Sequence, residues 1–286
     1  MSSIVILAAG LGSRFGGDKQ LIEFGKRKLT LMEYNLSHAV HAGFGRVIFV
    51  IRPELTEVLR QQVLPRLPDG LQYEIVLQTL NNVPAGCSVP AERSKPLGTG
   101  HALWCCHTLL SENFAVINAD DYYGAQAFEL LLTQAKNTQN SHSMVAYQLK
   151  NTLSKFGSVN RGLCQLSKEN NLEYIEECEN IIEQDDIIRG DLGVNGKRVK
   201  LNKDALISMN CWLFNTDIFP RLTEEIRYLL QDKKVTTECY LPNVVMKQIV
   251  QQQKKVIVLK TTEHWFGLTY QQDCQSVNEK IDAILT

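Results

Sequence analysis

Apolar and polar positions in the first half of the chain divide it into short apolar runs and longer mixed segments. The apolar runs, rich in β-branched residues, predict strands at Ser3–Leu7, Val47–Ile51, Gln72–Gln78, Phe114–Asn118 and Met144–Leu149. The longer segments predict helices between them, at Thr30–Ala42, from Pro53 on, at Gly98–Leu110 and from about Gly124 to Lys136. This alternation predicts an α/β fold with a mostly parallel sheet and helices on both faces.

The helix expected at Thr30–Ala42 has the clearest boundaries. Thr30 and Glu33 have the spacing of a capping box, in which each side chain accepts a hydrogen bond from the other residue's backbone N–H. Gly43 follows as the residue that ends the helix. Thr99 is expected near the N-cap of the helix at Gly98–Leu110.

The pattern changes after residue 150. Three short strand-like segments, expected to form an antiparallel hairpin, lie at Ser158–Asn160, Leu163–Leu166 and Leu172–Glu176. The polar stretch Asp185–Leu201 is expected to be a long loop. A strand, two helices, a strand and a closing helix follow, at Ile207–Phe214, Asp217–Gln231, Cys239–Gln253, Val256–Leu259 and Tyr270–Leu285. With no repeat or linker, we expect one domain over residues 1–286, with residues 151–205 as an elaboration packed on the main sheet.

Composition and charge exclude several classes of protein. The chain has 286 residues, 44% of them hydrophobic, with 30 basic and 31 acidic residues and a formal net charge of -1. This balance argues against a nucleic-acid groove or a membrane-surface patch. No apolar run approaches the roughly 20 residues that span a bilayer, and the N-terminus lacks a signal-peptide pattern. Eight cysteines without C-x-x-C spacing predict a reduced cytoplasmic protein and no zinc site.

The first strand leads directly into a glycine-rich stretch, ILAAGLGSRFGGDKQL, from Ile6 to Leu21. Successive backbone N–H groups in such a turn form a concave site for anions, and glycines let a ligand approach closely. Arg14 and Lys19 add two cations suited to phosphate oxygens. The stretch therefore predicts a phosphate-binding loop, although a flexible strand–helix turn with two solvated cations is the simpler alternative.

A dinucleotide-binding enzyme is a second alternative, because residues 10–16 also have a G-x-G-x-x-x-G pattern. That fingerprint expects an acidic residue at the end of the second strand, where it holds a ribose. The second strand here ends at Ile51-Arg52-Pro53, with no acid. This argues against hydride transfer.

Four blocks, in order, resemble the sugar-1-phosphate nucleotidyltransferases. LAAGLGSRFGGDKQL is similar to the L-A-A-G-x-G-x-R signature of that family, and Gln78 with KPLGTGHAL (Lys95–Leu103) to its nucleobase segment. AVINADDYYG (Ala115–Gly124) and HWFGLTYQQD (His264–Asp273) are similar to its two metal-binding segments. The resemblance implies a Rossmann-like, three-layer αβα fold with a mixed, mostly parallel sheet and a smaller antiparallel elaboration. It also implies a nucleotide-binding half (1–150) and a sugar-binding half (151–286).

The resemblance implies a role for individual residues of the nucleotide half. The base and ribose would meet backbone at Ala8, Ala9 and Gly10, and the phosphates would meet Gly12, Ser13, Arg14 and Lys19. Gln78 and Gly98 would read the base edge, with Thr99 supporting them. Asp120 would hold Mg²⁺, which prefers oxygen ligands and phosphates, with Asp121 as the fallback and an N-cap acid as the simpler explanation.

The sugar half departs further from the family pattern. Gly157, Glu176 and Asn210 stand where the resemblance places sugar contacts, but ordinary strand and turn residues are an equal alternative. Cys178 stands where members often have a lysine on the sugar phosphate. In the last block Gly267 replaces the usual aspartate, and Thr269 stands at the metal-ligand position, where a hydroxyl is a weaker Mg²⁺ ligand than a carboxylate.

The predicted function is Mg²⁺-dependent transfer of a nucleoside monophosphate from an NTP, with UTP or dTTP favoured, to a sugar 1-phosphate. Two alternatives stay open: a cytidylyltransferase acting on an alcohol phosphate such as phosphocholine, and a nucleotide-sugar-binding module without turnover. The expected partners are the triphosphate and the sugar phosphate, with no nucleic acid and no membrane. The sequence does not identify the sugar. It also does not determine the oligomeric state, so a homo-oligomer stays open.

Overall fold

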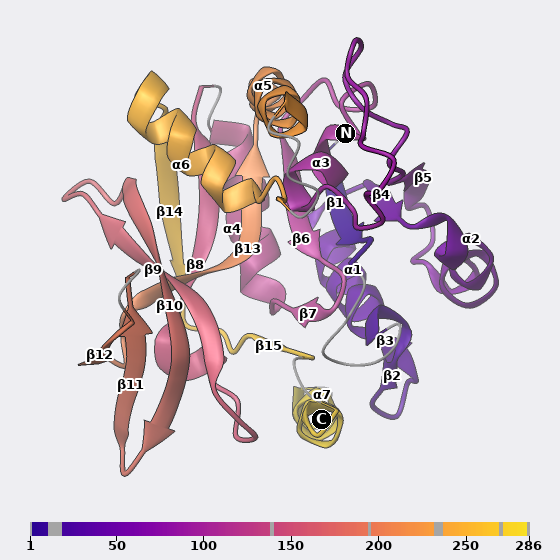
Figure 1. The fold of residues 1–286 in the computed structure, drawn as a ribbon. Coiled ribbons are helices and arrows are strands. Elements are labelled where there is room, and N and C mark those ends of the chain that lie inside the picture. Colours follow the sequence, from indigo (N-terminus) through magenta and orange to yellow (C-terminus); the bar gives the residue numbers. More distant parts are fainter. Residues whose placement is uncertain are drawn as a thin grey trace.

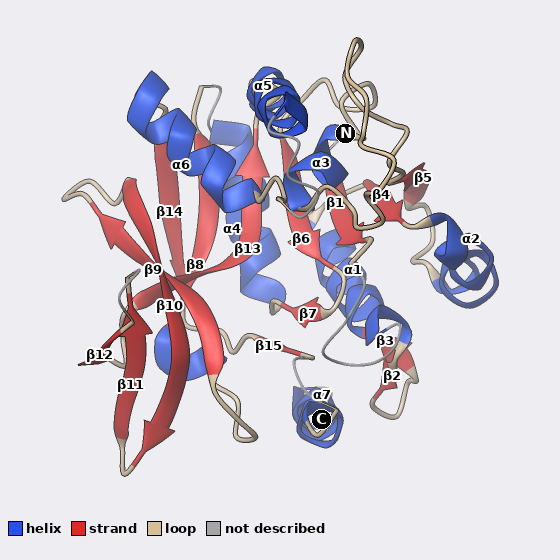
Figure 2. Cartoon of the chain, viewed as in Figure 1, coloured by secondary structure: helices blue, strands red, loops and turns tan. Residues whose placement is uncertain are grey.

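A computed structural model describes residues 2–10, 19–137, 140–193, 196–231, 237–268 and 271–284. Helices cover both faces of a central sheet, and a long antiparallel ribbon extends from one side of it (Figures 1 and 2). The predicted three-layer α/β architecture is confirmed.

The central sheet has eleven strands among the described residues. Nine of them follow the order β12-β11-β10-β9-β13-β6-β1-β4-β5, while β8 pairs with β13 and β14. The pairs β6–β1, β1–β4, β4–β5 and β8–β14 are parallel, and the pairs that involve β13 or the ribbon are antiparallel. These strands are β1 (Ser3–Ala8), β4 (Arg46–Ile51), β5 (Gln72–Leu77), β6 (Phe114–Asn118), β8 (His142–Gln148), β9 (Val159–Leu166), β10 (Leu172–Gln184), β11 (Ile187–Leu192), β12 (Lys197–Lys200), β13 (Leu206–Phe214) and β14 (Val256–Thr261).

Two apolar cores lie on the two faces of the sheet. Alternate residues of β1 point to opposite faces, so that Ile4 and Ile6 join one core, and Val5 and Leu7 join the other. The first core contains α1 (Leu31–Ala42) and α4 (Ala125–Asn137), and the short α2 (Thr56–Val58) continues as irregular helical turns into Leu59 and Val63 of that core. The second core contains α3 (Thr99–Trp104), α5 (Ile218–Gln231) and α6 (Leu241–Gln252).

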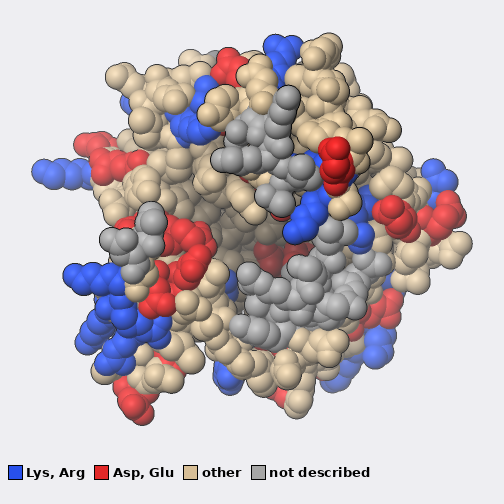
Figure 3. Space-filling model, in the orientation of Figure 1, with Lys and Arg blue, Asp and Glu red and all other residues tan. Residues whose placement is uncertain are grey.

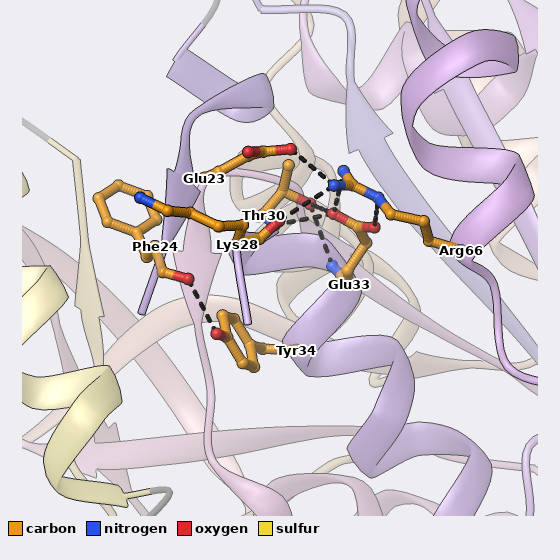
Figure 4. A network of polar contacts seen from close by, with 7 residues as sticks. All are labelled: Glu23, Phe24, Lys28, Thr30, Glu33, Tyr34 and Arg66. Atoms are coloured by element: carbon orange, nitrogen blue, oxygen red, sulfur yellow. Dashed lines mark hydrogen bonds and ion pairs between the residues drawn. The ribbon is translucent and has the colours of Figure 1, made fainter. Parts of the chain in front are cut away.

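Helix α1 begins and ends where its sequence predicts. The Thr30 hydroxyl accepts from the Glu33 N–H, and Glu33 Oε2 accepts from the Thr30 N–H at 2.8 Å, so both halves of the capping box are present. Gly43 ends the helix with φ 115°, a conformation that favours glycine. Figure 4 shows that the Arg66 guanidinium also reaches the Glu33 carboxylate, at 2.8 Å, and that of Glu23, at 2.6 Å.

The expectation of a long loop at Asp185–Leu201 is wrong. This segment forms β11 and β12, which extend the β9–β10 hairpin into a four-stranded ribbon. Gly190 is needed there, because a Cβ at this position would lie 2.5 Å from Cys178 Sγ. The three predicted fragments of the hairpin are also longer than expected and make up the two continuous strands β9 and β10.

A third, smaller core joins the C-terminus to the site region. Strand β15 (Phe266–Gly267) pairs with β7 (Asp121–Tyr122), and β2 (Glu23–Phe24) pairs with β3 (Leu29–Thr30). Helix α7 (Asp273–Ile284) packs against them through Val277 and Ile281. None of these four short strands was predicted. The helix expected at Gly98–Leu110 is also shorter, since α3 ends at Trp104 and turns follow.

Candidate functional site

The candidate site is a cavity at the carboxyl ends of β1 and β6, with a volume of about 390 Å³. In parallel α/β sheets, ligands bind in such crevices outside the strand ends. Figure 3 shows this face of the molecule hollowed near its middle. Its wall includes seven of the residues expected to bind the triphosphate or its metal, namely Ala8, Ala9, Gly10, Gln78, Gly98, Thr99 and Asp120.

The end of β1 forms the floor of the cavity. Ala8 and Ala9 are buried, while Gly10 is exposed. Among the described residues, none lies within 4 Å of a Cβ built on Gly10, so their packing does not require glycine at this position. A glycine facing open space in a cavity wall fits the close approach of a ligand.

Two adjacent carboxylates after β6 have different surroundings. Asp121 is buried, and its Oδ2 accepts from Asn118 Nδ2 at 2.9 Å and from the Tyr123 hydroxyl at 3.1 Å. Asp120 is half-buried and lines the cavity, and its carbonyl oxygen accepts from the Leu268 N–H of the β15 segment. Asp121 is therefore committed to the fold, and Asp120 is the carboxylate that the structure presents to the cavity.

Gln78 is buried in the cavity wall and held by hydrogen bonds. Its Nε2 lies 3.0 Å from the Gly98 carbonyl oxygen and 3.0 Å from His101 Nδ1. His101 Nε2 lies 2.6 Å from the Asn82 carbonyl oxygen. Gln78 and His101 also border a second cavity of about 310 Å³, so Gln78 lies in the wall between the two cavities.

Gly98 and Thr99 connect the cavity to α6. Gly98 has φ 96°, and a Cβ there would lie 2.7 Å from the Cys239 carbonyl oxygen, so both backbone conformation and packing require glycine. The Thr99 hydroxyl accepts from the Leu241 N–H at 3.0 Å. This bond fixes the start of α3 against the start of α6.

Four further polar residues line the cavity without having been singled out for binding from the sequence. They are Gln20, Lys95, Asn118 and Glu238. Gln20 is buried and its amide is 3.5 Å from the Ala8 carbonyl oxygen, while Glu238 is half-buried and Lys95 is exposed. Gln20, Lys95 and Asn118 lie inside the quoted blocks but at positions without a motif role, and Glu238 lies outside them, so no spacing signal could have found these four residues.

Several predicted residues lie outside the described part of the chain. Gly12, Ser13 and Arg14 fall in residues 11–18, and Thr269 falls in residues 269–270. Lys19 begins a short helical turn, Lys19–Leu21, but its side chain is not described. The phosphate-binding and second-metal-ligand roles of these residues therefore remain predictions.

The structure separates Glu176 from its neighbour Glu177. Glu176 is on the same face of β10 as Cys178, which is buried in the first core. Glu177 is on the opposite face, and its Oε2 lies 4.0 Å from a Cβ built on Gly162. That face belongs to the core that also contains the cavity-lining Leu7 and Ala102. The two glutamates therefore face opposite sides of the sheet, and cavity-lining residues belong to both cores, Ala8 and Ala119 to the first and Leu7 and Ala102 to the second.

Electrostatics distinguish Glu177 further. Burial, with a smaller contribution from Glu179, raises the pKa of Glu177, and Arg161 opposes that shift. The Arg161 guanidinium is buried, donates to the Thr152 carbonyl oxygen at 2.5 Å and lies 4.7 Å from the Trp265 ring centroid. Glu177 is therefore a partly desolvated carboxyl group. It can accept a hydrogen bond from a polar ligand, and in its protonated form it can also donate one.

Asn210 has an unusual backbone conformation near the cavity. Its φ is 57°, and the pairing of β13 with β8 is irregular between Ser208 and Trp212. Trp212 pairs with Val116, so the antiparallel register carries Asn210 toward the cavity-lining Asn118. A left-handed residue at a strand irregularity is typical of binding sites. Gly157 lies in the half-buried loop before β9, and no contact places it at the cavity.

Other features restrict what the described residues can hold. No helix among them is both long and apolar enough to cross a bilayer. Within the same residues, no group of three His, Cys, Asp or Glu side chains forms a metal cluster. All eight cysteines are free thiols, and burial raises the pKa of Cys105 to about 12 and of Cys178 to about 11.

The three-layer fold with a cavity at its strand ends is an α/β protein of Rossmann-like architecture. The MobA-like NTP transferase domain family matches residues 4–152, just over half of the chain, so the chain belongs to this family and is a nucleotidyltransferase. A comparison with curated proteins found no match.

Solved structures of low sequence identity share the fold over the whole chain. The inositol-1-phosphate CTP transferase of T. maritima has a TM-score of 0.65 at 16% identity, covering 99% of this chain and 95% of its own. A Bacillus anthracis protein described as a glucose-1-phosphate thymidylyltransferase, solved with a sucrose, has 0.66 at 12% identity, covering 99% and 95%. The UDP-glucose pyrophosphorylase of Acinetobacter baumannii has 0.60 at 14% identity, covering 100% and 98%.

Proposed function

We propose that the chain transfers a nucleoside monophosphate from UTP or dTTP to a sugar 1-phosphate and releases pyrophosphate. An oxygen of the sugar phosphate attacks the α-phosphorus, and the bond from that phosphorus to the bridging oxygen of the β-phosphate breaks. Pyrophosphate leaves with the electron pair of that bond. Because the acceptor is already ionised, the reaction needs positioning and charge neutralisation and no general base.

The observation that carries this proposal is the convergence of seven predicted residues on one cavity. They come from the end of β1, from Gln78, from the start of α3 and from the end of β6, which are far apart in the sequence. In the proposed complex, the base lies between the end of β1 and the wall formed by Gln78 and Gly98. The triphosphate then extends toward Asp120 and the glycine-rich loop with Arg14 and Lys19.

The donor set at the end of β6 fits a magnesium ion. Mg²⁺ binds through one or two carboxylates together with phosphate oxygens and water, and Asp120 supplies a carboxylate in the cavity wall. Asp120 would hold the ion, with Thr269 as the second protein ligand. When bound, Mg²⁺ neutralises charge on the phosphates during transfer. Asp121 takes no part, since Asn118 and Tyr123 occupy its Oδ2.

The acceptor is assigned to the second half of the chain. We assign its hydroxyl contacts to Asn210, at the irregularity of β13, and to the glutamate pair 176–177, in which we favour Glu177 because its carboxyl group is partly desolvated. Residues 1–150 would then bind the triphosphate and residues 151–286 the sugar phosphate, within one domain. A cytoplasmic location fits these two substrates, and neither nucleic acid nor a membrane is a proposed partner.

Pyrophosphate release tests the proposal. The protein is incubated with Mg²⁺, one of the nucleoside triphosphates and one of a set of sugar 1-phosphates, with phosphocholine as the comparison acceptor. Release with UTP or dTTP that depends on a sugar 1-phosphate is the expected result. Release only with CTP and phosphocholine would replace the proposal by the alcohol-phosphate alternative. UTP binding without release in any mixture would support a binding module without turnover.

A further inference from the structure

The base that the cavity accepts depends on how the Gln78 carboxamide is oriented. An amide NH₂ group has two donors and the amide oxygen is an acceptor. Nε2 of Gln78 lies within hydrogen-bond distance of the Gly98 carbonyl oxygen and of His101 Nδ1, both at 3.0 Å. These two contacts use both N–H donors. Among the described residues no donor to Gln78 Oε1 is found, so Oε1 is the polar atom that the side chain has left for a ligand.

The tautomer of His101 fixes this orientation. The Asn82 carbonyl oxygen, 2.6 Å from His101 Nε2, can only accept a hydrogen bond, so Nε2 carries the proton. His101 is fully buried, and burial is the main cause that lowers its pKa. In the neutral ring Nδ1 is then an acceptor, and it requires the N–H side of Gln78.

The Gly98 carbonyl blocks the opposite orientation. If the carboxamide turned over, Gln78 Oε1 would lie against the Gly98 carbonyl oxygen and against the lone pair of His101 Nδ1. Two buried acceptor–acceptor contacts would replace two hydrogen bonds, and buried polar groups without partners are costly. Gln78 therefore offers its acceptor oxygen Oε1, and not a donor, to the base that occupies the cavity.

We propose that His101 is a positioning residue that selects the pyrimidine base by holding the Gln78 carboxamide with its oxygen toward the ligand. Uracil and thymine carry an N–H at ring position 3, which complements this oxygen. Cytosine carries a lone pair at position 3, which opposes it. The selection rests on the proposed function, since it takes the cavity to be the nucleotide site.

The orientation of Gln78 would let the cavity discriminate between UTP and CTP, which the fold alone does not do. The three structurally similar proteins are named for cytidine, thymidine and uridine nucleotides, although their folds are alike. A site built to bond one ring atom rejects the base that lacks it, because a buried group is then left unpaired. A preference for UTP over CTP of about tenfold or more is expected from such a mismatch.

Equilibrium binding of UTP and CTP tests the inference without requiring turnover. The dissociation constants are measured by calorimetry for the wild type, for His101→Leu and for the control His107→Leu. His107 is exposed, follows α3 in the same segment and contacts Trp104, not Gln78. The wild type and the control should prefer UTP about tenfold, and His101→Leu, which removes one of the two contacts that orient Gln78, should reduce that preference about threefold.

Three results would overturn the inference. They are a wild type that prefers CTP, a His101→Leu variant that binds nucleotide with the wild-type ratio, and a control that loses the ratio equally. If His101→Leu does not fold, ¹⁵N NMR of the wild-type ring decides. A proton on Nε2 and none on Nδ1 at neutral pH is the expected result, and an Nδ1–H tautomer or an imidazolium contradicts it. Normal base selection without pyrophosphate release would contradict only the proposed reaction.

Discussion

Asp120 and Asp121 are neighbours whose surroundings assign them different tasks. Asp120→Asn is expected to reduce turnover about 100-fold or more while UTP binding is largely kept, because an amide removes charge needed at the reacting phosphates. Asp121→Asn should instead reduce stability, since an amide oxygen accepts from Asn118 and Tyr123 less strongly than a carboxylate oxygen does. Steady-state kinetics, UTP titration and urea unfolding of both variants check this pair. Unchanged turnover in Asp120→Asn would remove that residue from the metal site.

Glu177 and Glu176 form a second matched pair of neighbours. Glu177→Gln is expected to raise the KM for the sugar phosphate about tenfold, because a carboxylate bonded to sugar hydroxyls is stronger than an amide. Glu176→Gln should change the KM less than twofold, since Glu176 is on the opposite face of β10. The KM values are measured with the acceptor found by pyrophosphate release. An equal effect of both variants, or an effect of Glu176→Gln alone, would contradict the assignment.

How well single residues of the site could be predicted depended on whether they sit in a motif. Gln78, Gly98 and Asp120 were found because their blocks have a recognisable order and spacing. The choice between Glu176 and Glu177 was not available from the sequence, since a shift of one residue in a strand reverses its faces. Lys95 and Glu238 reach the cavity through loop geometry that leaves no periodic signal.

At the scale of elements, one cation connects three segments next to the site. Arg66 follows the irregular helical turns after α2, and it bonds Glu23 of β2, the Lys28 carbonyl oxygen and Glu33 of α1 (Figure 4). The Glu33 side chain is 3% exposed, and burial is the main cause that raises its pKa. Arg66 therefore compensates a buried carboxylate and fixes the β2–β3 hairpin against α1.

Removing this cation should destabilise the protein. Arg66→Met leaves the Glu33 carboxylate buried without its partner, and we expect a loss of about 2 kcal/mol in the free energy of unfolding. The double variant Arg66→Met, Glu33→Gln should recover part of that loss, because the amide oxygen can still accept from Thr30. Arg60→Met, which breaks an exposed pair with Glu57, is the control and should change little. Urea unfolding measures these variants together with the single variant Glu33→Gln, and strictly additive single effects would exclude the coupling.

Several elements with buried apolar faces were predicted well, and the solvated strands β11 and β12 were not. Strands β1, β4 and β6 and helices α1 and α5 lie close to their expected ranges. Strands β11 and β12 were missed because the ribbon has few buried side chains, so its residues do not alternate clearly in polarity. The two-residue strands β7 and β15 are too short for any periodic signal, yet their pairing brings the last block to Asp120.

At the scale of the whole molecule, a buried histidine makes stability depend on pH. His142 of β8 is fully buried, and burial lowers its pKa to about 4, although Asp217 at 3.3 Å acts in the opposite direction. Below a pH of about 6.5 the unfolded chain binds a proton at His142 that the folded chain does not bind until about pH 4. The free energy of unfolding should therefore fall as pH decreases from about 6.5 to 4, by up to about 3 kcal/mol from this residue.

The comparison of two variants isolates this contribution. His142→Gln removes the titrating ring and keeps polar groups that can face Gln248 and the Asn215 N–H. Its stability should fall less steeply than that of the wild type between pH 6.5 and 4. His41→Gln, at an exposed position of α1, should keep the wild-type slope. Thermal unfolding across this pH range measures the slopes, and a wild-type slope in His142→Gln would contradict the assignment.

The central claim is that the cavity at the ends of β1 and β6 holds a triphosphate whose α-phosphorus is transferred to a sugar phosphate. The most direct measurement follows ³²P from [α-³²P]UTP and, separately, from [γ-³²P]UTP in the presence of Mg²⁺ and the sugar 1-phosphate. We predict the α-label in a nucleotide sugar and the γ-label in pyrophosphate, with both products formed at least about 100-fold more slowly by Asp120→Asn. Label released from the α-position as UMP alone, or γ-label found in the sugar product, would contradict the account.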